Sequence, residues 1–234
     1  MLSAGCKIDI NTVSVFNFVQ TEALNDDIKK LVLPGLTHVD VCSNATAKEY
    51  NFHGIDAIFI EAGLPESINE SVDLIKKVRL VNQIACIFVL APHAKSFSSI
   101  NYYLAGADHC IKLPSDAAEK SKLLLNTVNN SHWKKTTKLF MDRIRLLLSS
   151  DTGKIEISYT EMTIIDALLS APNQVMSQDD IAKTLDPNII FYDPRALEKT
   201  ISRLRTKIKK AYNIELIFSV RAFGYRLRRG TISG

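Results

Sequence analysis

Short apolar runs alternate with amphipathic stretches over the first 130 residues of the chain. Two of these runs, Ala57–Ile60 and Cys86–Leu90, are nearly uninterrupted, which is typical of central strands buried on both faces of a sheet. Helical patterns lie between the runs, most clearly at Glu66–Val81 and Asp116–Asn129. This alternation predicts an α/β fold with a doubly wound, five-stranded parallel sheet of flavodoxin type. The expected strands are Val13–Val19, Thr37–Val41, Ala57–Glu61, Ala85–Ala91 and His109–Lys112.

The pattern changes after a polar, basic and aperiodic stretch at residues 129–138, which we interpret as a linker. Strands Leu139–Leu148 and Ile155–Ile157 are expected to pair around a turn at Asp151–Gly153. Three helices follow, and a hairpin closes the chain. The expected helix caps are Ser158, Ser177 and Asp193, and the hairpin strands are Glu215–Val220 and Gly224–Arg228. The chain therefore divides into a domain at 1–128, the linker at 129–138 and an α+β domain at 139–234.

The helix predicted at Pro194–Tyr212 has two opposed faces. At 100° per residue, four apolar side chains fall within about 60° of one another and form a core stripe. The opposite face is basic, and only Glu198 offsets it. The apolar set is Leu197, Ile201, Leu204 and Ile208, and the basic set is Arg195, Lys199, Arg203, Lys207 and Lys210. This helix alone fits either a solvated basic face or a helix that enters the major groove of DNA.

Charge is distributed unevenly between the two parts. Residues 1–133 hold 11 Lys and Arg against 14 Asp and Glu, whereas residues 134–234 hold 18 against 11. The closing hairpin contributes Arg221, Arg226, Arg228 and Arg229. This segregation indicates that the C-terminal domain meets a polyanion.

Several functional classes are disfavoured. The chain contains no stretch of eighteen apolar residues and no signal-peptide pattern, so we expect a cytoplasmic protein without a membrane span. The cysteines are scattered, and His53, His93 and His109 lack the spacing of metal ligands or a catalytic triad. We therefore expect reduced thiols, no metal, no cofactor and no enzymatic activity.

Three separated motifs resemble the OmpR/PhoB-type winged-helix response regulators of bacteria. Arg195–Ile208 is similar to the family's recognition helix, Ser219–Leu227 to its wing, and Ser158–Met162 to its first helix. The resemblance covers residues 139–229 and implies a winged helix-turn-helix that binds promoter DNA as a transcription regulator. Ala222 departs from the family, which usually has glycine there, so a different turn is expected at the wing tip.

The resemblance also assigns roles on DNA. It implies base contacts by Thr200 and Arg203, phosphate contacts by Arg195, Arg205 and Lys207, and minor-groove entry by Arg221. Lys199 and Tyr225 complete the predicted set of DNA-binding residues.

Residues 13–130 resemble the family's receiver domain more weakly, through Asp56–Pro65 and Gly106–Pro114. Receivers bind Mg²⁺ with an acidic pair, accept a phosphoryl group on aspartate, and contact that group with a hydroxyl and a lysine. Here these positions fall on other residue types, and Cys110 replaces the aromatic switch residue. The acidic pair falls on Gln20 and Thr21, the acceptor on Glu61, the hydroxyl on Ala91, and the lysine on Leu113 with Lys112 one place early.

Because Mg²⁺ prefers carboxylate oxygens, this substitution pattern predicts a receiver that has lost phosphotransfer. Glu61 is then either a mimic of a charged acceptor, for which Lys112 is the candidate partner, or a remnant of the pocket. Two alternatives stay open: a conventional phosphorylated regulator, and an interaction protein that contacts RNA polymerase and binds nucleic acid non-specifically.

The resemblance further implies a homodimer. Family members pair through a face built from the fourth helix, fifth strand and fifth helix, which correspond here to Ser96–Leu104, His109–Lys112 and Asp116–Asn129. The predicted interface residues are Tyr102, Tyr103, Asp108 and Glu119.

Overall fold

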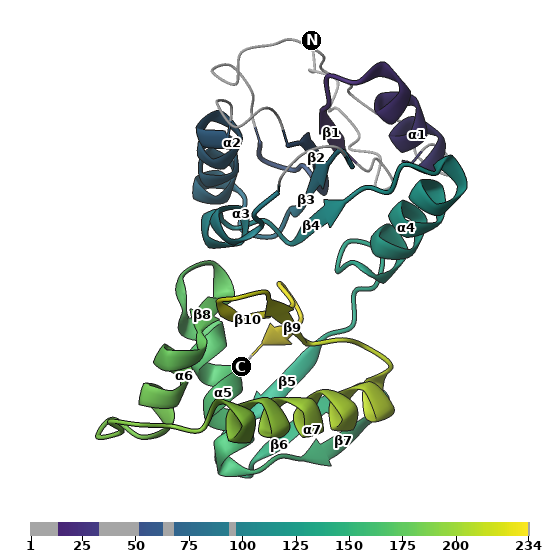
Figure 1. Cartoon of the computed structure of the whole chain (residues 1–234). Helices are drawn as coiled ribbons and strands as arrows, with labels where there is room; N and C mark the ends of the chain where they lie inside the picture. Colours follow the sequence, from purple (N-terminus) through teal and green to yellow (C-terminus); the bar gives the residue numbers. More distant parts are fainter. Residues whose placement is uncertain (1–13, 33–51, 63–67, 94–96, 234) are drawn as a thin grey trace, which may run out of the picture.

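The computed structural model describes residues 14–32, 52–62, 68–93 and 97–233, which form two domains joined by a linker at residues 131–138 (Figure 1). The N-terminal domain is an α/β sandwich, and the C-terminal domain contains two small sheets and three α-helices. In Figure 1 the strands labelled β8, β9 and β10 lie on the side of the C-terminal domain that faces the N-terminal domain.

The N-terminal sheet is parallel, with strand order β1-β2-β3-β4. Every residue of β3 and all but the last of β2 are buried, which confirms that these apolar runs are central strands. The predicted strand Thr37–Val41 lies outside the described residues. The strands are β1 (Val15–Phe18), β2 (Ala57–Glu61), β3 (Cys86–Ala91) and β4 (His109–Lys112).

In the described segments of this domain, four helices cover the two faces of the sheet. Successive strand residues point to opposite faces, so Ile58 and Ile87 join one apolar core while Phe59 and Phe88 join the other. The rings of Phe59 and Phe88 stack at 4.7 Å between centroids. The helices are α1 (Glu22–Val32), α2 (Ile68–Val81), α3 (Ile100–Ala105) and α4 (Ala117–Asn130).

The C-terminal domain begins with a strand meander. The sequence pattern predicts one strand over Leu139–Leu148, but the chain turns at residues 143–146, where Leu146 has a φ of 54°. The prediction of a single strand over Leu139–Leu148 was therefore wrong, because the apolar pattern continues through the turn and does not mark it. The resulting sheet has the order β11-β5-β6-β7. Its strands are β5 (Leu139–Asp142), β6 (Leu147–Ser150), β7 (Gly153–Glu156) and β11 (Ile232–Ser233).

Three helices and a hairpin follow, as predicted. Ser158, Ser177 and Asp193 each accept a backbone N–H at a helix start, and Ser158 and Glu161 form a capping box. The hairpin pairs with the unpredicted strand β8, giving the order β8-β10-β9. The elements are α5 (Tyr159–Ser170), β8 (Val175–Ser177), α6 (Gln178–Leu185), α7 (Pro194–Tyr212), β9 (Ile217–Val220) and β10 (Gly224–Leu227).

The core of the C-terminal domain contains the predicted apolar stripe of α7. Ile201, Leu204 and Ile208 are completely buried, and Leu197 is 6% exposed. Gly224 allows β8 to approach the hairpin, because a Cβ there would lie 2.2 Å from the carbonyl oxygen of Met176. In the described part of the chain, no helix is long and apolar enough to cross a membrane.

Candidate nucleic-acid interface

The outer face of α7 carries three exposed cations at four-residue spacing, Arg195, Lys199 and Arg203. This spacing places them along one side of the helix, opposite the buried stripe. Asp193 caps the helix, and its side chain accepts the N–H of Arg195 at 2.9 Å. Thr200 is half-buried and donates to the carbonyl of Ala196 at 3.0 Å. The arrangement presents a rigid basic ridge to a polyanion.

Arg205 and Tyr225 stabilise the domain from within. Arg205 donates to the carbonyl of Ile217 at 2.8 Å and to the Ser219 hydroxyl at 2.9 Å. Its guanidinium carbon lies 5.4 Å from the centre of the Tyr225 ring, and Tyr225 is only 4% exposed. The burial of Tyr225 argues against its predicted DNA contact. The predicted phosphate contact of Arg205 stays a prediction, and in the structure its guanidinium joins α7 to the hairpin.

Lys207 also has a partner inside the domain. Its ammonium lies 2.7 Å from the Glu161 carboxylate and 3.3 Å from the carbonyl of Glu156. Glu161 is 7% exposed, so Lys207 balances a nearly buried negative charge. In the structure Lys207 thus forms an ion pair between α7 and α5, and its predicted phosphate contact stays a prediction.

The hairpin tip carries the exposed Arg221. The next residue, Ala222, has a φ of 58°, and the N–H of Phe223 donates to the carbonyl of Val220 at 3.0 Å. Ala222 thus takes the left-handed backbone conformation that glycine favours, at a steric cost of about 1 kcal/mol. The turn keeps Arg221 accessible beside α7.

The other hairpin arginines face the N-terminal domain. Arg226, Arg228 and Arg229 are 6%, 4% and 6% exposed, which contradicts their prediction as part of a basic surface. Arg226 lies between aromatic rings of both domains, 5.0 Å from the centre of Tyr103 and 4.2 Å from that of Phe218. The alternation of side chains along β10 predicts part of this arrangement. Tyr225 and Leu227 point into the core of the C-terminal domain, so their neighbours point away from it.

A network around Asp108 joins the two domains. Its carboxylate accepts from Arg79 at 2.6 Å, from Arg229 at 3.1 Å and from the N–H of Ile87 at 2.8 Å. Burial acts to raise the pKa of Asp108, but the nearby Arg79, His132 and Arg229 lower it well below its ordinary value. Close by, the Asn173 amide donates to the carbonyl of Leu104 at 2.7 Å.

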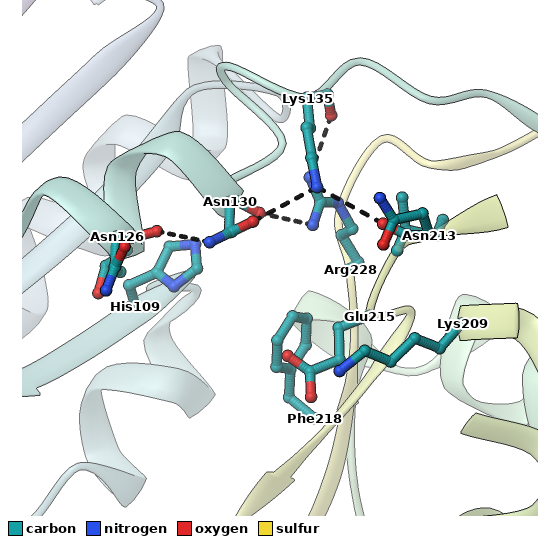
Figure 2. Close-up of a pocket in the computed structure, with 11 residues that line it drawn as sticks. His109, Asn126, Asn130, Lys135, Lys209, Asn213, Glu215, Phe218 and Arg228 are labelled. Carbon is teal, nitrogen blue, oxygen red and sulfur yellow. Dashed lines mark hydrogen bonds between the residues drawn. The ribbon is translucent and has the colours of Figure 1, made fainter. Parts of the chain in front are cut away.

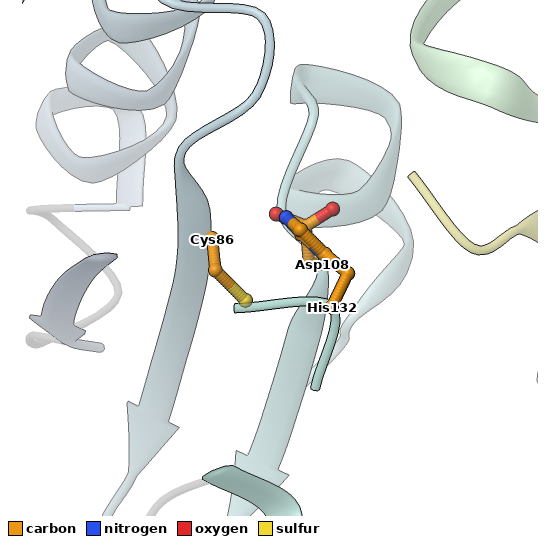
Figure 3. A group of neighbouring side chains, drawn as sticks. All are labelled: Cys86, Asp108 and His132. Atoms are coloured by element: carbon orange, nitrogen blue, oxygen red, sulfur yellow. The ribbon is translucent and has the colours of Figure 1, made fainter. Parts of the chain in front are cut away.

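Cys86, Asp108 and His132 bring ligand-type atoms within 4.8 Å of one another (Figure 3). The chemistry of this group opposes a metal ion, because two guanidinium groups already neutralise Asp108. Burial raises the pKa of the Cys86 thiol, and the Asp108 charge raises it further. A protonated thiol is a poor metal ligand. We assign this group to the interdomain network.

His109 also packs where the two domains meet. Its lowered pKa predicts that the stability of the protein depends on pH. Its ring stacks on Phe88 at 5.0 Å, and burial followed by the charge of Arg226 lowers its pKa to about 3. Between pH 6.5 and 3 the unfolded chain therefore binds more protons at this position. The contribution of His109 to the free energy of unfolding is fully present above pH 6.5 and is lost as the pH drops through this window. Urea unfolding of His109→Phe should show a shallower pH dependence than wild type; an equal slope would contradict this assignment.

The four predicted dimer residues lie in three different places: the core of the N-terminal domain, its surface, and the contact between the two domains. Tyr102 is 2% exposed and belongs to the core, while Asp108 is held by the network described above. Tyr103 contacts Arg226, and only Glu119 of the four is exposed. The dimer roles of Tyr102 and Asp108 therefore need correction, because burial and contacts within the chain occupy their side chains.

The strand ends of the N-terminal sheet hold the pocket predicted from the receiver resemblance. One Glu61 carboxylate oxygen accepts the N–H groups of Gln20 and Thr21, each at 2.9 Å. The other accepts the Thr21 hydroxyl at 2.6 Å. The residues at the acidic-pair positions thus act as hydrogen-bond donors to the residue at the acceptor position.

The remaining pocket positions are apolar or point elsewhere. Ala91 is fully buried and Leu113 is 4% exposed, whereas Lys112 is exposed. Within the described segments, Glu61 forms no ion pair with Lys112, so the suggested pairing is wrong. The sequence identified the changed residue types, but it gave no signal that Gln20 and Thr21 would bind Glu61.

The chain is similar in sequence and in fold to known proteins. Residues 152–227 match the family model of the C-terminal domain of transcriptional regulatory proteins. The chain is 26% identical over 194 residues to the transcriptional regulatory protein PhoP of Escherichia coli strain K12, covering 80% of this chain and 86% of PhoP. The response regulator DrrB of Thermotoga maritima, an OmpR/PhoB homologue, is similar with a TM-score of 0.42 and 14% identity, covering 92% of this chain and 99% of DrrB.

A further solved structure, the C-terminal domain of the nisin resistance regulator NsrR, is similar with 32% identity and a TM-score of 0.34, covering 41% of this chain and 93% of that domain. The PhoP alignment extends over both domains, and the family model covers most of the three-helix and hairpin region. The chain therefore belongs to the OmpR/PhoB-type response regulators, and it is a transcription regulator with a C-terminal winged-helix DNA-binding domain.

Proposed function

We propose that this response regulator acts without aspartyl phosphorylation. The observation that supports the proposal most directly is the binding of the Glu61 carboxylate by Gln20 and Thr21. A phosphorylatable pocket needs carboxylate oxygens free to hold Mg²⁺. Among the described residues of the pocket only Glu61 supplies a carboxylate, and three hydrogen bonds from the chain already satisfy it. The buried Ala91 and Leu113 offer neither a hydroxyl nor an ammonium to a phosphoryl group.

The proposed DNA contacts follow from exposure. We assign base-edge contacts in the major groove to Arg203 and Thr200, and phosphate contacts to Arg195 and Lys199. Arg221 at the hairpin tip would enter the neighbouring minor groove. The arginines and Lys199 are exposed on the outer ridge of α7 or on the hairpin turn, so the interdomain contact leaves them accessible. Thr200 is half-buried and follows Lys199 on the same helix.

We propose a cytoplasmic role on promoter DNA without catalytic activity. A homodimer built on the predicted face would compete with the interdomain contact, because Tyr103 and Asp108 contact Arg226 and Arg229 of the same chain. Two copies on adjacent half-sites would instead be paired through the DNA, about one helical turn apart.

Incubation with acetyl phosphate and Mg²⁺ should leave the mass of the intact protein unchanged. The expected result follows from the lack of a metal-binding carboxylate cluster in the described pocket. Intact-mass spectrometry checks it, with an ordinary receiver labelled in parallel to show that the donor is active. Stoichiometric addition of one phosphoryl group would contradict the proposal and favour a conventional phosphorylated regulator.

A further inference from the structure

A cavity of about 410 Å³ lies between the two domains (Figure 2). Asn126 and Asn130 of α4 and Lys135 of the linker form one side. Lys209 near the end of α7, together with Asn213 and Arg228, forms the other. The volume lies within the range typical of small-molecule sites. Any molecule bound here would contact both domains at once.

The charges around this cavity are unbalanced. Lys135, Lys209 and Arg228 contribute three cations, and Glu215 is the only carboxylate among the lining residues. The neighbouring asparagine amides add neutral groups that donate and accept hydrogen bonds. This set of groups matches the oxygen atoms of a phosphate or carboxylate better than an apolar ligand.

Arg228 provides an independent observation. Its side chain is buried, and its terminal nitrogens donate to the carbonyls of Asn130 at 2.7 Å and Lys135 at 3.0 Å. Its Nε atom has no hydrogen-bond partner among the described residues. The nearby Glu215 attracts its charge, but no described carboxylate lies within ion-pair distance of Arg228. A buried charge that lacks a counter-ion is unfavourable. The adjacent Arg229, by contrast, is paired with Asp108.

We propose that this cavity binds a small organic anion carrying phosphate or carboxylate groups, and that the bound anion holds the two domains together. The anion would supply the counter-charge that Arg228 lacks and would bridge the lysines of the linker and α7. Because the ligand contacts both domains, it binds the closed arrangement better than a separated one and shifts the population toward it. The proposal adds a chemical input signal to a regulator that does not use phosphorylation.

Isothermal titration with inorganic phosphate and with citrate, at an ionic strength matched with sodium chloride, tests the site. We expect saturable binding of at least one anion to the full chain. Lys209→Gln should weaken it by about tenfold, since it removes one charged hydrogen-bond donor from the cavity wall. Lys210→Gln is the matched control, because it removes the same charge from the exposed neighbouring position.

The two probes distinguish the classes of ligand: tighter phosphate binding indicates a phosphorylated ligand, and tighter citrate binding indicates a polycarboxylate. Absence of saturable binding by both anions would overturn the site. Equal weakening by Lys209→Gln and Lys210→Gln would also overturn it, because a diffuse basic surface would then explain the binding. Circular dichroism confirms that both variants are folded.

Tryptic cleavage of the linker at residues 131–138 tests the coupling between the domains. The bound anion should slow cleavage at the linker lysines in wild type and in Lys210→Gln, but not in Lys209→Gln at the same anion concentration. Anion binding that leaves the cleavage rate of wild type unchanged would overturn the proposal that the ligand holds the domains together.

Discussion

Replacing Asp108 with alanine is expected to lower the free energy of unfolding of the N-terminal domain by about 3–5 kcal/mol. The carboxylate is 3% exposed and neutralises two buried guanidinium groups, those of Arg79 and Arg229. Arg79 also donates to the carbonyls of Gly106 and Ala85. It therefore cannot move into solvent without breaking further hydrogen bonds. The alanine variant leaves both charges buried without their counter-ion.

Urea unfolding measures this loss, and Trp133 reports on the N-terminal domain. It is the only tryptophan in the chain, and its ring meets those of Phe59 and Phe88 edge-on at 6.4 Å. Asp73→Ala is the matched control within the same domain, because its partner Lys76 lies on the surface and the pair is solvated. Equal effects of the two substitutions would show that the Asp108 network does not stabilise the domain.

A second variant, Arg229→Gln, separates the two functions of the network. Asp108 binds Arg79 within its own domain and Arg229 across the interface. Arg229→Gln removes the interdomain ion pair and a hydrogen bond to the carbonyl of Asn173 in the C-terminal domain, but it leaves the pair of Asp108 and Arg79 intact. It should therefore destabilise the N-terminal domain much less than Asp108→Ala. A similar loss in both variants would indicate that the interdomain contact, and not the pairing with Arg79, dominates the stability.

The elements of this fold are predictable where a local pattern determines them. The apolar residues of α7, spaced by four, three and four positions, correspond to its buried stripe, and Ser158, Ser177 and Asp193 cap helices as their sequences predict. These features depend on residues within one or two turns of one another. Strand β8 and the break before Leu146 lacked such a pattern, and the sequence analysis missed them.

The partners of charged side chains are not predictable in the same way. Lys207 and Arg203 have the same place in the basic pattern of α7, yet only Lys207 meets a carboxylate, that of Glu161, 46 residues away in the chain. Asp108 and Arg229 are separated by 121 residues. Sequence periodicity shows which face of a helix is polar, whereas the packing of distant elements decides which charges on that face remain free.

This difference between Arg203 and Lys207 leads to opposite expectations for DNA binding. Arg203→Ala is expected to weaken binding to a specific promoter by about 1–3 kcal/mol and to relax the base preference at one position. Its side chain is exposed on the outer ridge of α7. Lys207→Ala should change affinity little, because its ammonium is bound to Glu161, and should instead reduce stability by about 1 kcal/mol or less for this half-exposed pair.

Promoter titrations at several salt concentrations, with thermal unfolding of the same variants, measure both effects. Lys199→Ala serves as the phosphate-contact control: it should weaken specific and random DNA alike and reduce the dependence of affinity on salt. If Arg203→Ala also weakens both DNAs equally, Arg203 contacts only the backbone, and the non-specific nucleic-acid binding of the alternative hypothesis gains support. A large affinity loss in Lys207→Ala without a loss of stability would mean that Lys207 leaves Glu161 when DNA binds. The ion pair between α7 and α5 would then be a contact that the DNA phosphate replaces.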